Sequence, residues 1–347
     1  MDGRSGSVCW YDWWGTGDGG DVDATTVAVG TRVVVRRLLR GRAGPSGGPA
    51  MTDVVGRVVA RTGEVLRVER RDGELVDVAM ADVVTLKQVP DGAGRRRTRP
   101  ARSVDVDTLT RICTRGWPPL QTARVGDWVL RAAGGFTGRA NSVALHGEPG
   151  LPASEALAEV IAFYESLDLP PKGQAVAGSP GERLCVAEGW VAAGGSHPGA
   201  VVQVADLDPA RDFAHDPRVS VVDTAVDDWL ALYDRAGAVD PAVARAVLEG
   251  CPVVGFVRLE DAGELVAIGR VAVTGDWAGL GCVEVAATHR RRGLATRVVE
   301  ASLAWATARG AVSAYLQTMR HNTAALPLYR PYGFVDHHDY RYLVPPP

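Results

Sequence analysis

The feature that most constrains the fold of this chain is the order of secondary structure that its C-terminal part predicts. Two apolar segments, Val253–Leu259 and Leu265–Val273, flank a turn at Asp261-Ala262-Gly263 and predict a β-hairpin. The elements expected after the hairpin are a strand over Cys282–Ala286, an arginine-glycine loop, a helix over Leu294–Arg309, a strand over Val312–Thr318, a short helix from Asn322 and a strand over Phe334–Leu343. This order predicts a mixed α/β domain. Ahead of the hairpin, helices are expected over Val221–Arg235 and from Asp240-Pro241 to Gly250.

The loop before the long helix has the chemistry of a phosphate site. Arg290, Arg291 and Arg292 precede Gly293, and the helix is expected to start at Leu294. The first amides of a helix have no partner inside the helix and lie at the positive end of its dipole, so they attract phosphate. Gly293 has no Cβ, which lets the backbone approach a diphosphate closely, and the arginines can add charge-assisted hydrogen bonds. The sequence therefore predicts a phosphate-bearing cofactor here.

Two motifs in this region resemble those of the GCN5-related N-acetyltransferase (GNAT) superfamily. Arg290-x-x-Gly293-x-Ala295 resembles its acetyl-CoA signature, R/Q-x-x-G-x-G/A. The second motif follows at the expected distance and reads Asn322-x-x-Ala325-x-x-Leu328-Tyr329-x-x-x-Gly333-Phe334. The resemblance implies a GNAT fold of the α/β (α+β) type, a mixed, mostly antiparallel sheet flanked by helices. It also implies acetyl-CoA as the acyl donor and no metal.

The resemblance further implies roles for individual residues. The strand that carries Val283, Glu284 and Val285 should separate from the next strand and pair with pantetheine in the gap. Asn322 should contact the pantetheine or hold the following helix, and Tyr329 should protonate the leaving thiolate. Pro327 departs from a regular helix and indicates that this helix starts later or is tighter than the motif suggests. The pyrophosphate should bind Arg290, Arg291, Arg292, Gly293, Leu294, Ala295 and Thr296.

Direct transfer from a thioester to an amine needs a group that accepts the proton of the amine. Glu284 is the nearest carboxylate in sequence, and its side chain should alternate with those of Val283 and Val285 and point toward the acceptor. It is either this base or a solvated surface charge. A backbone amide of the strand is expected to be the oxyanion donor. His289 and His321 flank the cofactor segments and are interpreted as bystanders.

The N-terminal part predicts a separate small barrel. Valine-rich strands alternate there with turns at Gly63 and Asp72-Gly73. The expected strands are Thr31–Val35, Val54–Ala60, Val65–Arg70, Leu75–Val78 and Val83–Lys87. The wider chain is similar to a group of actinobacterial acetyltransferases, some described as histone-acetyltransferase-like, in which an SH3-like barrel precedes a GNAT module. This similarity rests on residues 30–35, 52–56, 84–90, 131 and 135–142.

These patterns predict five parts of the chain. They are a disordered leader (1–21), an SH3-like β-barrel (22–90), a linker (91–103), a companion half (104–220) and a catalytic GNAT domain (221–347). A degenerate GNAT repeat is one interpretation of the companion half. No second R-x-x-G-x-G/A loop occurs in the companion half, which predicts a single cofactor site. Arg131, Thr137, Arg139 and Asn141 either line an acceptor pocket or satisfy buried backbone groups. Trp277 is expected in a loop before the cofactor strand, where it either covers a substrate or packs against the rest of the protein.

Charge bears on whether the barrel binds nucleic acid. Residues 31–100 hold 15 Arg and Lys against 8 Asp and Glu, although the chain as a whole has a net charge of −3. An excess of basic residues in a small domain is typical of proteins that bind nucleic acid. However, Lys87 and Lys172 are the only two lysines in a chain of 38 basic residues, which indicates a GC-rich genome. Aromatic residues are also missing between these charges, so nucleic acid is disfavoured without being excluded.

Composition constrains the remaining function classes. No apolar run reaches the ~18 residues of a membrane span, and the first residues do not read as a signal peptide. Five scattered cysteines predict neither a disulfide framework nor a zinc site and suggest the cytoplasm. The expected function is an N-acetyltransferase that acts on an amine-bearing acceptor of unknown identity, with the oligomeric state open. The alternatives are a catalytically silent acyl-CoA-binding regulatory module and a DNA-associated regulator that uses the basic barrel.

Overall fold

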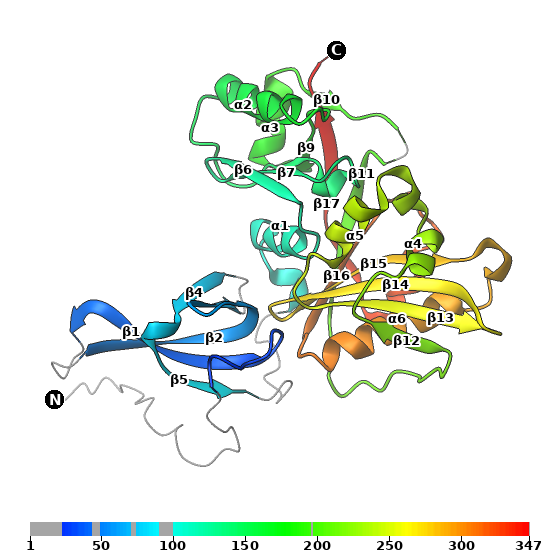
Figure 1. Ribbon diagram of the computed structural model, residues 1–347. Helices are drawn as coiled ribbons and strands as arrows, with labels where there is room; N and C mark the ends of the chain where they lie inside the picture. Colours follow the sequence, from blue (N-terminus) through cyan, green and yellow to red (C-terminus); the bar gives the residue numbers. More distant parts are fainter. Residues whose placement is uncertain (1–22, 44–48, 71–73, 90–99, 196, 347) are drawn as a thin grey trace, which may run out of the picture. The chain divides into compact units, whose positions relative to one another are not determined.

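A computed structural model describes residues 23–43, 49–70, 74–89, 100–195 and 197–346. The chain forms two compact units, residues 1–70 with 75–90 and residues 71–74 with 91–347 (Figure 1). The expected leader, residues 1–21, and most of the expected linker lie outside the described residues. Among the described residues, no helix combines the length and apolar character needed to cross a bilayer.

The first unit is a five-stranded antiparallel sheet in the order β4-β3-β2-β1-β5. Its strands lie close to the expected positions, although the first two are longer: β1 (Arg32–Ala43), β2 (Pro49–Arg61), β3 (Val65–Arg70), β4 (Leu75–Ala79) and β5 (Val83–Gln88). Alternate residues of the strands, such as Val33 and Val35, are fully buried in one core with Val58, Leu66 and Val68. The valine-rich pattern thus produces the expected small strand-rich domain.

The second unit is built on one twelve-stranded mixed sheet. Its order is β12-β13-β14-β15-β16-β11-β17-β9-β8-β7-β6, and β10 pairs with β17. All pairs are antiparallel except β15 with β16 and β8 with β9. The strands are β6 (Gln121–Val125), β7 (Trp128–Ala132), β8 (Val143–Ala144), β9 (Gly173–Val176), β10 (Val191–Ala192), β11 (Gly199–Asp206), β12 (Val219–Val222), β13 (Val254–Asp261), β14 (Glu264–Thr274), β15 (Trp277–Val285), β16 (Ser313–Thr318) and β17 (Val335–Val344).

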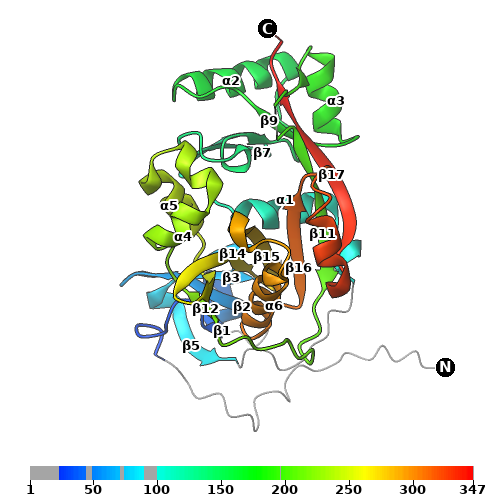
Figure 2. The ribbon, with the colours of Figure 1, turned by 90° about the vertical axis from the view of Figure 1, so that its right-hand side faces the viewer.

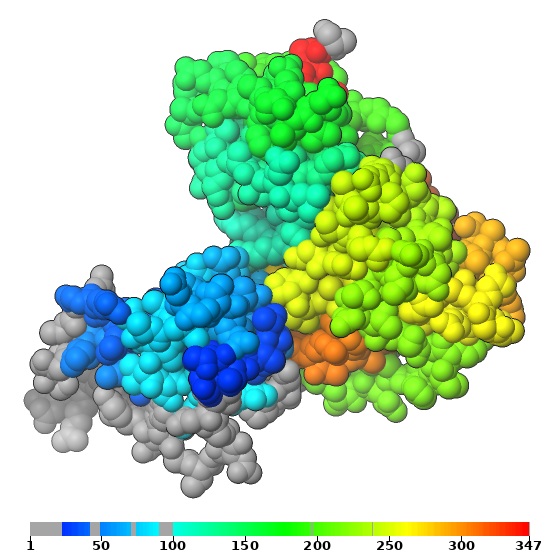
Figure 3. Space-filling view, viewed as in Figure 1, coloured from blue at the N-terminus to red at the C-terminus, as the bar shows by residue number. Residues whose placement is uncertain are grey.

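Helices cover both faces of the C-terminal part of this sheet. The α-helices of the unit are α1 (Val106–Arg115), α2 (Ala153–Glu165), α3 (Pro180–Ala187), α4 (Asp227–Leu232), α5 (Pro241–Glu249), α6 (Leu294–Thr307) and α7 (Leu326–Tyr329). Val271 and Leu280 share a core with Leu303 of α6, whereas Phe256 and Ile268 share another with Trp229 of α4. Helices α4 and α5 cover the face that is turned to the viewer in Figure 3.

Strand β11 joins the middle of the chain to its C-terminal part. It lies between β16 and β17, and it pairs antiparallel with both. Figure 2 shows β17 running beside β11 toward the segment that carries α2 and α3. Residues 104–220 and 221–347 therefore share one sheet, and β12 spans the expected boundary between them. The exact domain boundaries stay predictions.

Two local expectations were wrong. Residues 221–235, expected to be helical, begin in β12 and reach a helix only at Asp227, because Val219–Val222 pair with the edge of β13. Trp277 is the first residue of β15 and not part of a loop. It is fully buried beside Leu109 and Tyr315, so it packs in a core and covers no substrate.

Candidate functional site

The strands β15 and β16 are paired over only part of their length. The parallel pairing runs from Trp277 opposite Ser313 to Leu280 opposite Leu316. Beyond it β15 continues to Val285 without a partner on this side among the described residues, while β14 still pairs with its other edge. This is the separation that the resemblance implies. It leaves main-chain groups on one edge of β15 open to a ligand.

A β-bulge at Cys282 accompanies the separation. Gly281 lies opposite Arg270 and Glu284 opposite Ile268, so β15 has one residue more than β14 in this interval. Cys282 has a φ of +53°, in the left-handed region that residues other than glycine rarely adopt. A bulge bends its strand and re-aims the side chains, which explains why β15 leaves β16 just after this point.

Side chains beyond the bulge alternate between the two faces. Val283 and Val285 pack in the core beneath α6. Glu284 points to the other face, where its carboxylate accepts a hydrogen bond from the Asp234 N–H at 3.2 Å. Burial raises the pKa of Glu284, and the Asp234 carboxylate also raises it. The expected alternation is therefore present, and Glu284 is a half-buried carboxylate and not a freely solvated one.

The loop before α6 presents unpaired backbone N–H groups. Gly293 is the N-cap of α6, with a φ of +77°, and its carbonyl accepts hydrogen bonds from the amides of Thr296 and Arg297. In the described part of the chain, the N–H groups of Leu294 and Ala295 have no acceptor. They lie at the positive end of a helix of 14 residues. This end of α6 can therefore bind an anion.

The three arginines of the loop differ in their partners. Arg290 donates from Nε to the carbonyl of Val285 at 3.2 Å, and Arg292 pairs with Asp261 at 3.3 Å. Arg291 is exposed, with a φ of +64°. No ion pair or side-chain hydrogen bond engages Arg291 within the described residues. Arg290 and Arg291 thus have no carboxylate partner among the described residues, and Arg291 also keeps all its N–H groups open to a ligand.

Asn322 holds the turn that precedes α7. Its side-chain oxygen accepts from the Ala325 N–H at 3.2 Å, and its carbonyl accepts from the same amide and from that of Leu326. Helix α7 begins only at Leu326, so Pro327 falls in the first turn, where no intrahelical N–H is required. The late start that Pro327 indicated is confirmed. Of the two roles expected for Asn322, the contacts support the structural one.

Tyr329, at the end of α7, is buried beside the bulge. It is 7% exposed and packs edge-on against Phe334, with the ring centroids 5.7 Å apart. Burial, together with a smaller effect of the nearby Cys282 thiol, raises the pKa of Tyr329 to about 12. Its hydroxyl has no hydrogen-bond partner among the described residues. The structure therefore brings a protonated phenol to the point where β15 and β16 separate.

Sequence reasoning missed Cys282 and Tyr233. The side chains of Tyr233 and Cys282 pack in the same core, and burial raises the pKa of both groups. Tyr233 lies after α4, in the segment that was expected to be one continuous helix. No local pattern marks the bulge at Cys282, because it depends on the pairing of β15 with β14.

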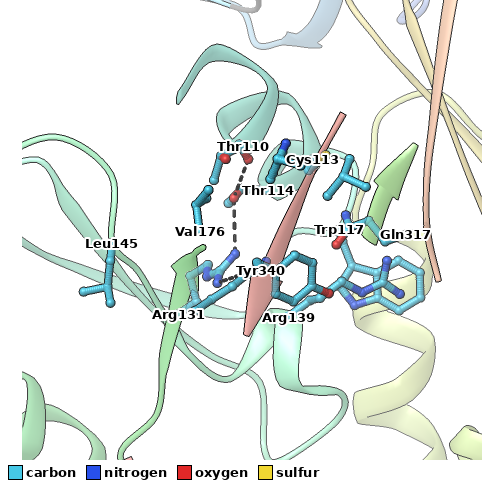
Figure 4. A pocket seen from close by; sticks show the side chains of 13 residues that line it. Thr110, Cys113, Thr114, Trp117, Arg131, Arg139, Leu145, Val176, Gln317 and Tyr340 are labelled. Atoms are coloured by element: carbon cyan, nitrogen blue, oxygen red, sulfur yellow. Dashed lines mark hydrogen bonds between the residues drawn. The ribbon is translucent and has the colours of Figure 1, made fainter. Parts of the chain in front are cut away.

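The polar cluster of the middle segment separates into two kinds of residue. Asn141 satisfies backbone groups: its oxygen accepts from the amides of Ala133 and Gly135, and its nitrogen donates to the carbonyls of Phe136 and Thr137. The Thr137 side chain accepts from the indole of Trp117. Arg131 and Arg139, in contrast, line a cavity together with Trp117 and Gln317 (Figure 4). The contacts thus support the backbone-satisfying interpretation for Asn141, whereas an acceptor pocket at Arg131 and Arg139 stays a prediction.

Two histidines, His289 and His321, flank the segments that carry the cofactor motifs. The ring of His289 contacts the Thr288 hydroxyl at 2.9 Å. His321 lies in the turn just before Asn322. Over the described ranges, no group of three or more His, Cys, Asp and Glu side chains is placed to hold a metal ion.

Two family models cover nearly the whole described chain. The model described as "Probable histone acetyltransferase Rv0428c C-terminal" matches residues 71–343, and the model described as "Rv0428c N-terminal Sm-like domain" matches residues 27–87. The second match agrees with the small strand-rich domain, for which the sequence predicted an SH3-like barrel.

Individual relatives agree with these matches. The probable histone acetyltransferase Rv0428c of Mycobacterium tuberculosis is 31% identical over 326 residues, which cover 91% of this chain and 95% of the relative. The uncharacterized N-acetyltransferase YobR of Bacillus subtilis is 29% identical over 250 residues, 68% of this chain and 98% of the relative. A solved GCN5-related N-acetyltransferase from Kribbella flavida has a TM-score of 0.50 at 17% identity, with 71% of this chain and 97% of the other covered, and shows the fold. The chain therefore belongs to the family of the probable histone acetyltransferase Rv0428c and has the fold of a GCN5-related N-acetyltransferase.

Proposed function

We propose that the protein transfers the acetyl group of acetyl-CoA directly to an amine, at the point where β15 and β16 separate. The observation that carries this proposal is the presence of unpaired main-chain groups in two successive segments of the chain. The open edge of β15 after Leu280 leads into the N–H groups of Leu294 and Ala295. An extended arm with amide groups followed by a pyrophosphate needs these two features in this order.

The described contacts narrow the set of cofactor-binding residues. In this proposal, main-chain groups of β15 from Val283 to Val285 pair with the amides of the pantetheine arm, which the open edge of the strand supports. The N–H groups of Leu294 and Ala295 and the guanidinium of Arg291 hold the pyrophosphate, which their lack of other partners among the described residues supports. The Thr296 N–H already donates to Gly293, and Arg292 is paired with Asp261, so these two contribute less.

Bound acetyl-CoA would supply the activated acyl carbon. Transfer to an amine forms a C–N bond and breaks the C–S bond, so the amine loses a proton and the departing sulfur gains one. Tyr329, with a pKa of about 12, keeps its proton at neutral pH and can donate it to the sulfur. Glu284 has a raised pKa and faces away from the α6 core, so it can accept the amine proton directly or through water.

Calorimetric titration of acetyl-CoA into the full chain tests the site. Gly293→Glu would place a carboxylate beside the free amides of α6, and we expect it to abolish one-site binding by the native protein. Gly178→Glu is the matched control, because Gly178 also has a positive φ (+74°) and no atom within 4 Å of the added Cβ. Binding by the native protein and the control alone supports the proposal. Unchanged binding by Gly293→Glu, or no binding by the native chain, refutes it.

Turnover separates an enzyme from a silent binding module. Release of free CoA thiol, measured with a panel of amines, should be lost in Tyr329→Phe while acetyl-CoA still binds. If acetyl-CoA binds at the loop but no amine in the panel is acetylated by the native protein, the regulatory alternative is favoured.

A further inference from the structure

Three arginine side chains gather around Trp117 inside the second unit. The guanidinium carbon of Arg139 lies 4.1 Å from the centroid of the Trp117 ring, and that of Arg270 lies 4.8 Å from it. Arg131 lines the same cavity as Arg139 and Trp117 (Figure 4). Arg131 and Arg270 are each 2% exposed. Buried charges of one sign are costly, and proteins normally pair them.

Two of these arginines have only neutral partners. Arg131 donates to the carbonyl and hydroxyl of Ser142 at 2.8 and 2.9 Å, to Gln174 at 2.6 Å and to Thr114 at 3.2 Å. Arg270 donates to the carbonyls of Leu248 and Gly116 at 2.8 and 2.9 Å, and to the Cys251 sulfur. These bonds satisfy the N–H groups but neutralise no charge.

Arg139 has no hydrogen bond and no ion pair among the residues that the structure describes. It is held by stacking on Trp117, which leaves the N–H edge of the guanidinium available. Burial lowers the pKa of Arg139, and the phenols of Tyr340, Tyr233 and Tyr342 raise it by more. The groups that act most strongly on Arg139 thus include no carboxylate. The guanidinium of Arg139 can therefore donate hydrogen bonds to an anionic ligand.

The cavity reaches the proposed transfer site. A Cβ on Gly281, the first residue of β15 beyond the paired stretch, would meet the Trp117 ring at 3.9 Å. Gln317, the first residue of β16 beyond that stretch, lines the cavity, and its side-chain oxygen is buried without a partner in the described part of the chain. An acceptor that reached from Arg139 toward Gln317 would therefore arrive beside the open edge of β15.

We propose that the acceptor is an amine that also carries a carboxylate, and that Arg139 binds this carboxylate. The inference rests on the proposed function and names its substrate class. The small volume of the cavity, about 20 Å³, disfavours an anion as large as phosphate. The planar guanidinium matches a carboxylate with two parallel hydrogen bonds. The unpartnered Gln317 oxygen is placed to accept from the amine.

The experiment compares acceptors that differ only in the carboxylate. CoA release is measured for amino acids of varied side chain, each beside its decarboxylated amine and its carboxamide, and beside O-phosphoethanolamine. We expect kcat/KM at least about tenfold higher for the carboxylated member of the best pair. Arg139→Met should erase this preference mainly through KM, and Arg139→Lys should restore part of it. Arg309→Met is the matched control, because Arg309 also stacks on a tryptophan, at 3.8 Å from the Trp305 centroid, outside the cavity lining.

Each outcome either supports or overturns the binding of an acceptor carboxylate by Arg139. A preference for carboxylated amines that is lost in Arg139→Met and kept in Arg309→Met supports the inference. Preference for the decarboxylated amine, for the carboxamide or for the phosphate overturns it, as does an unchanged preference in a folded Arg139→Met variant. Acetyl-CoA binding is titrated in parallel. If the cofactor binds at the loop but no carboxylated amine reacts, this inference fails while the cofactor assignment stands.

Discussion

Replacing Gly293 by alanine distinguishes backbone strain from loss of phosphate binding. Gly293 has a φ of +77°, and a Cβ added to it meets no atom within 4 Å, so the variant is strained but not crowded. An L-residue in the left-handed region costs about 1–2 kcal/mol. For a domain of this size that corresponds to a melting temperature lower by roughly 2–8 °C. Gly178→Ala, at a φ of +74° and equally open, should lose a similar amount.

The two variants should differ in acetyl-CoA affinity. The new Cβ at position 293 stands beside the free amides of Leu294 and Ala295, where the pyrophosphate is proposed to lie. Loss of one charge-assisted hydrogen bond costs about 1.5–3 kcal/mol, which corresponds to a Kd higher by about 10- to 150-fold. Gly178→Ala should leave Kd unchanged. Calorimetry gives Kd, and thermal unfolding gives the strain.

One result would refute this reasoning. If Gly293→Ala loses thermal stability as Gly178→Ala does but binds acetyl-CoA with native affinity, then Gly293 serves only the turn into α6. The pyrophosphate would then lie elsewhere.

Three further outcomes are expected. Tyr329→Phe should lower kcat by about 100-fold or more. It should not lower stability, because the removed hydroxyl has no hydrogen-bond partner among the described residues. An unchanged kcat, or a large fall in melting temperature, would argue against Tyr329 as the proton donor. Alkaline pH should destabilise the protein: the pKa values of Tyr164 and Tyr329 are each raised to about 12, so the native state keeps protons that the unfolded state loses above pH ~10. Stability from these two groups is complete below pH ~10 and falls by about 2.7 kcal/mol per tyrosine as the pH approaches 12, which denaturant unfolding at several pH values can follow. Asn322→Ala should destabilise the turn before α7 by about 1 kcal/mol, with a smaller effect when Asn322→Asp keeps an acceptor oxygen.

Local sequence patterns predicted the parts of the fold that local interactions determine. The predicted hairpin turn is present, with positive φ at Ala262 and Gly263. Asp240 caps α5 through the Ala242 N–H, with Pro241 at the first helical position. The motif at Arg290 to Ala295 placed the start of α6 correctly, because glycine and helix-terminal chemistry act over a few residues.

Long-range pairing explains what the sequence did not predict. The bulge at Cys282 arises from the register of β15 on β14. The cavity combines Trp117 and Arg139 with Gln317, which lies in a distant strand. Sequence reasoning named Arg139 as a possible pocket residue but had no means to show that it lacks a carboxylate partner. That finding depends on every element packed around it.

The position of β11 between β16 and β17 has a consequence for how the molecule is made. Strand β11 leaves the ribosome well before either of its partners, and both of its edges stay unpaired until then. Such non-local pairing slows folding and exposes strand edges that can aggregate. Because β17 also pairs with β9 and β10, its arrival joins the middle segment to the C-terminal part in one step. An excised fragment that begins at residue 221 would lack β11 and should not close its sheet.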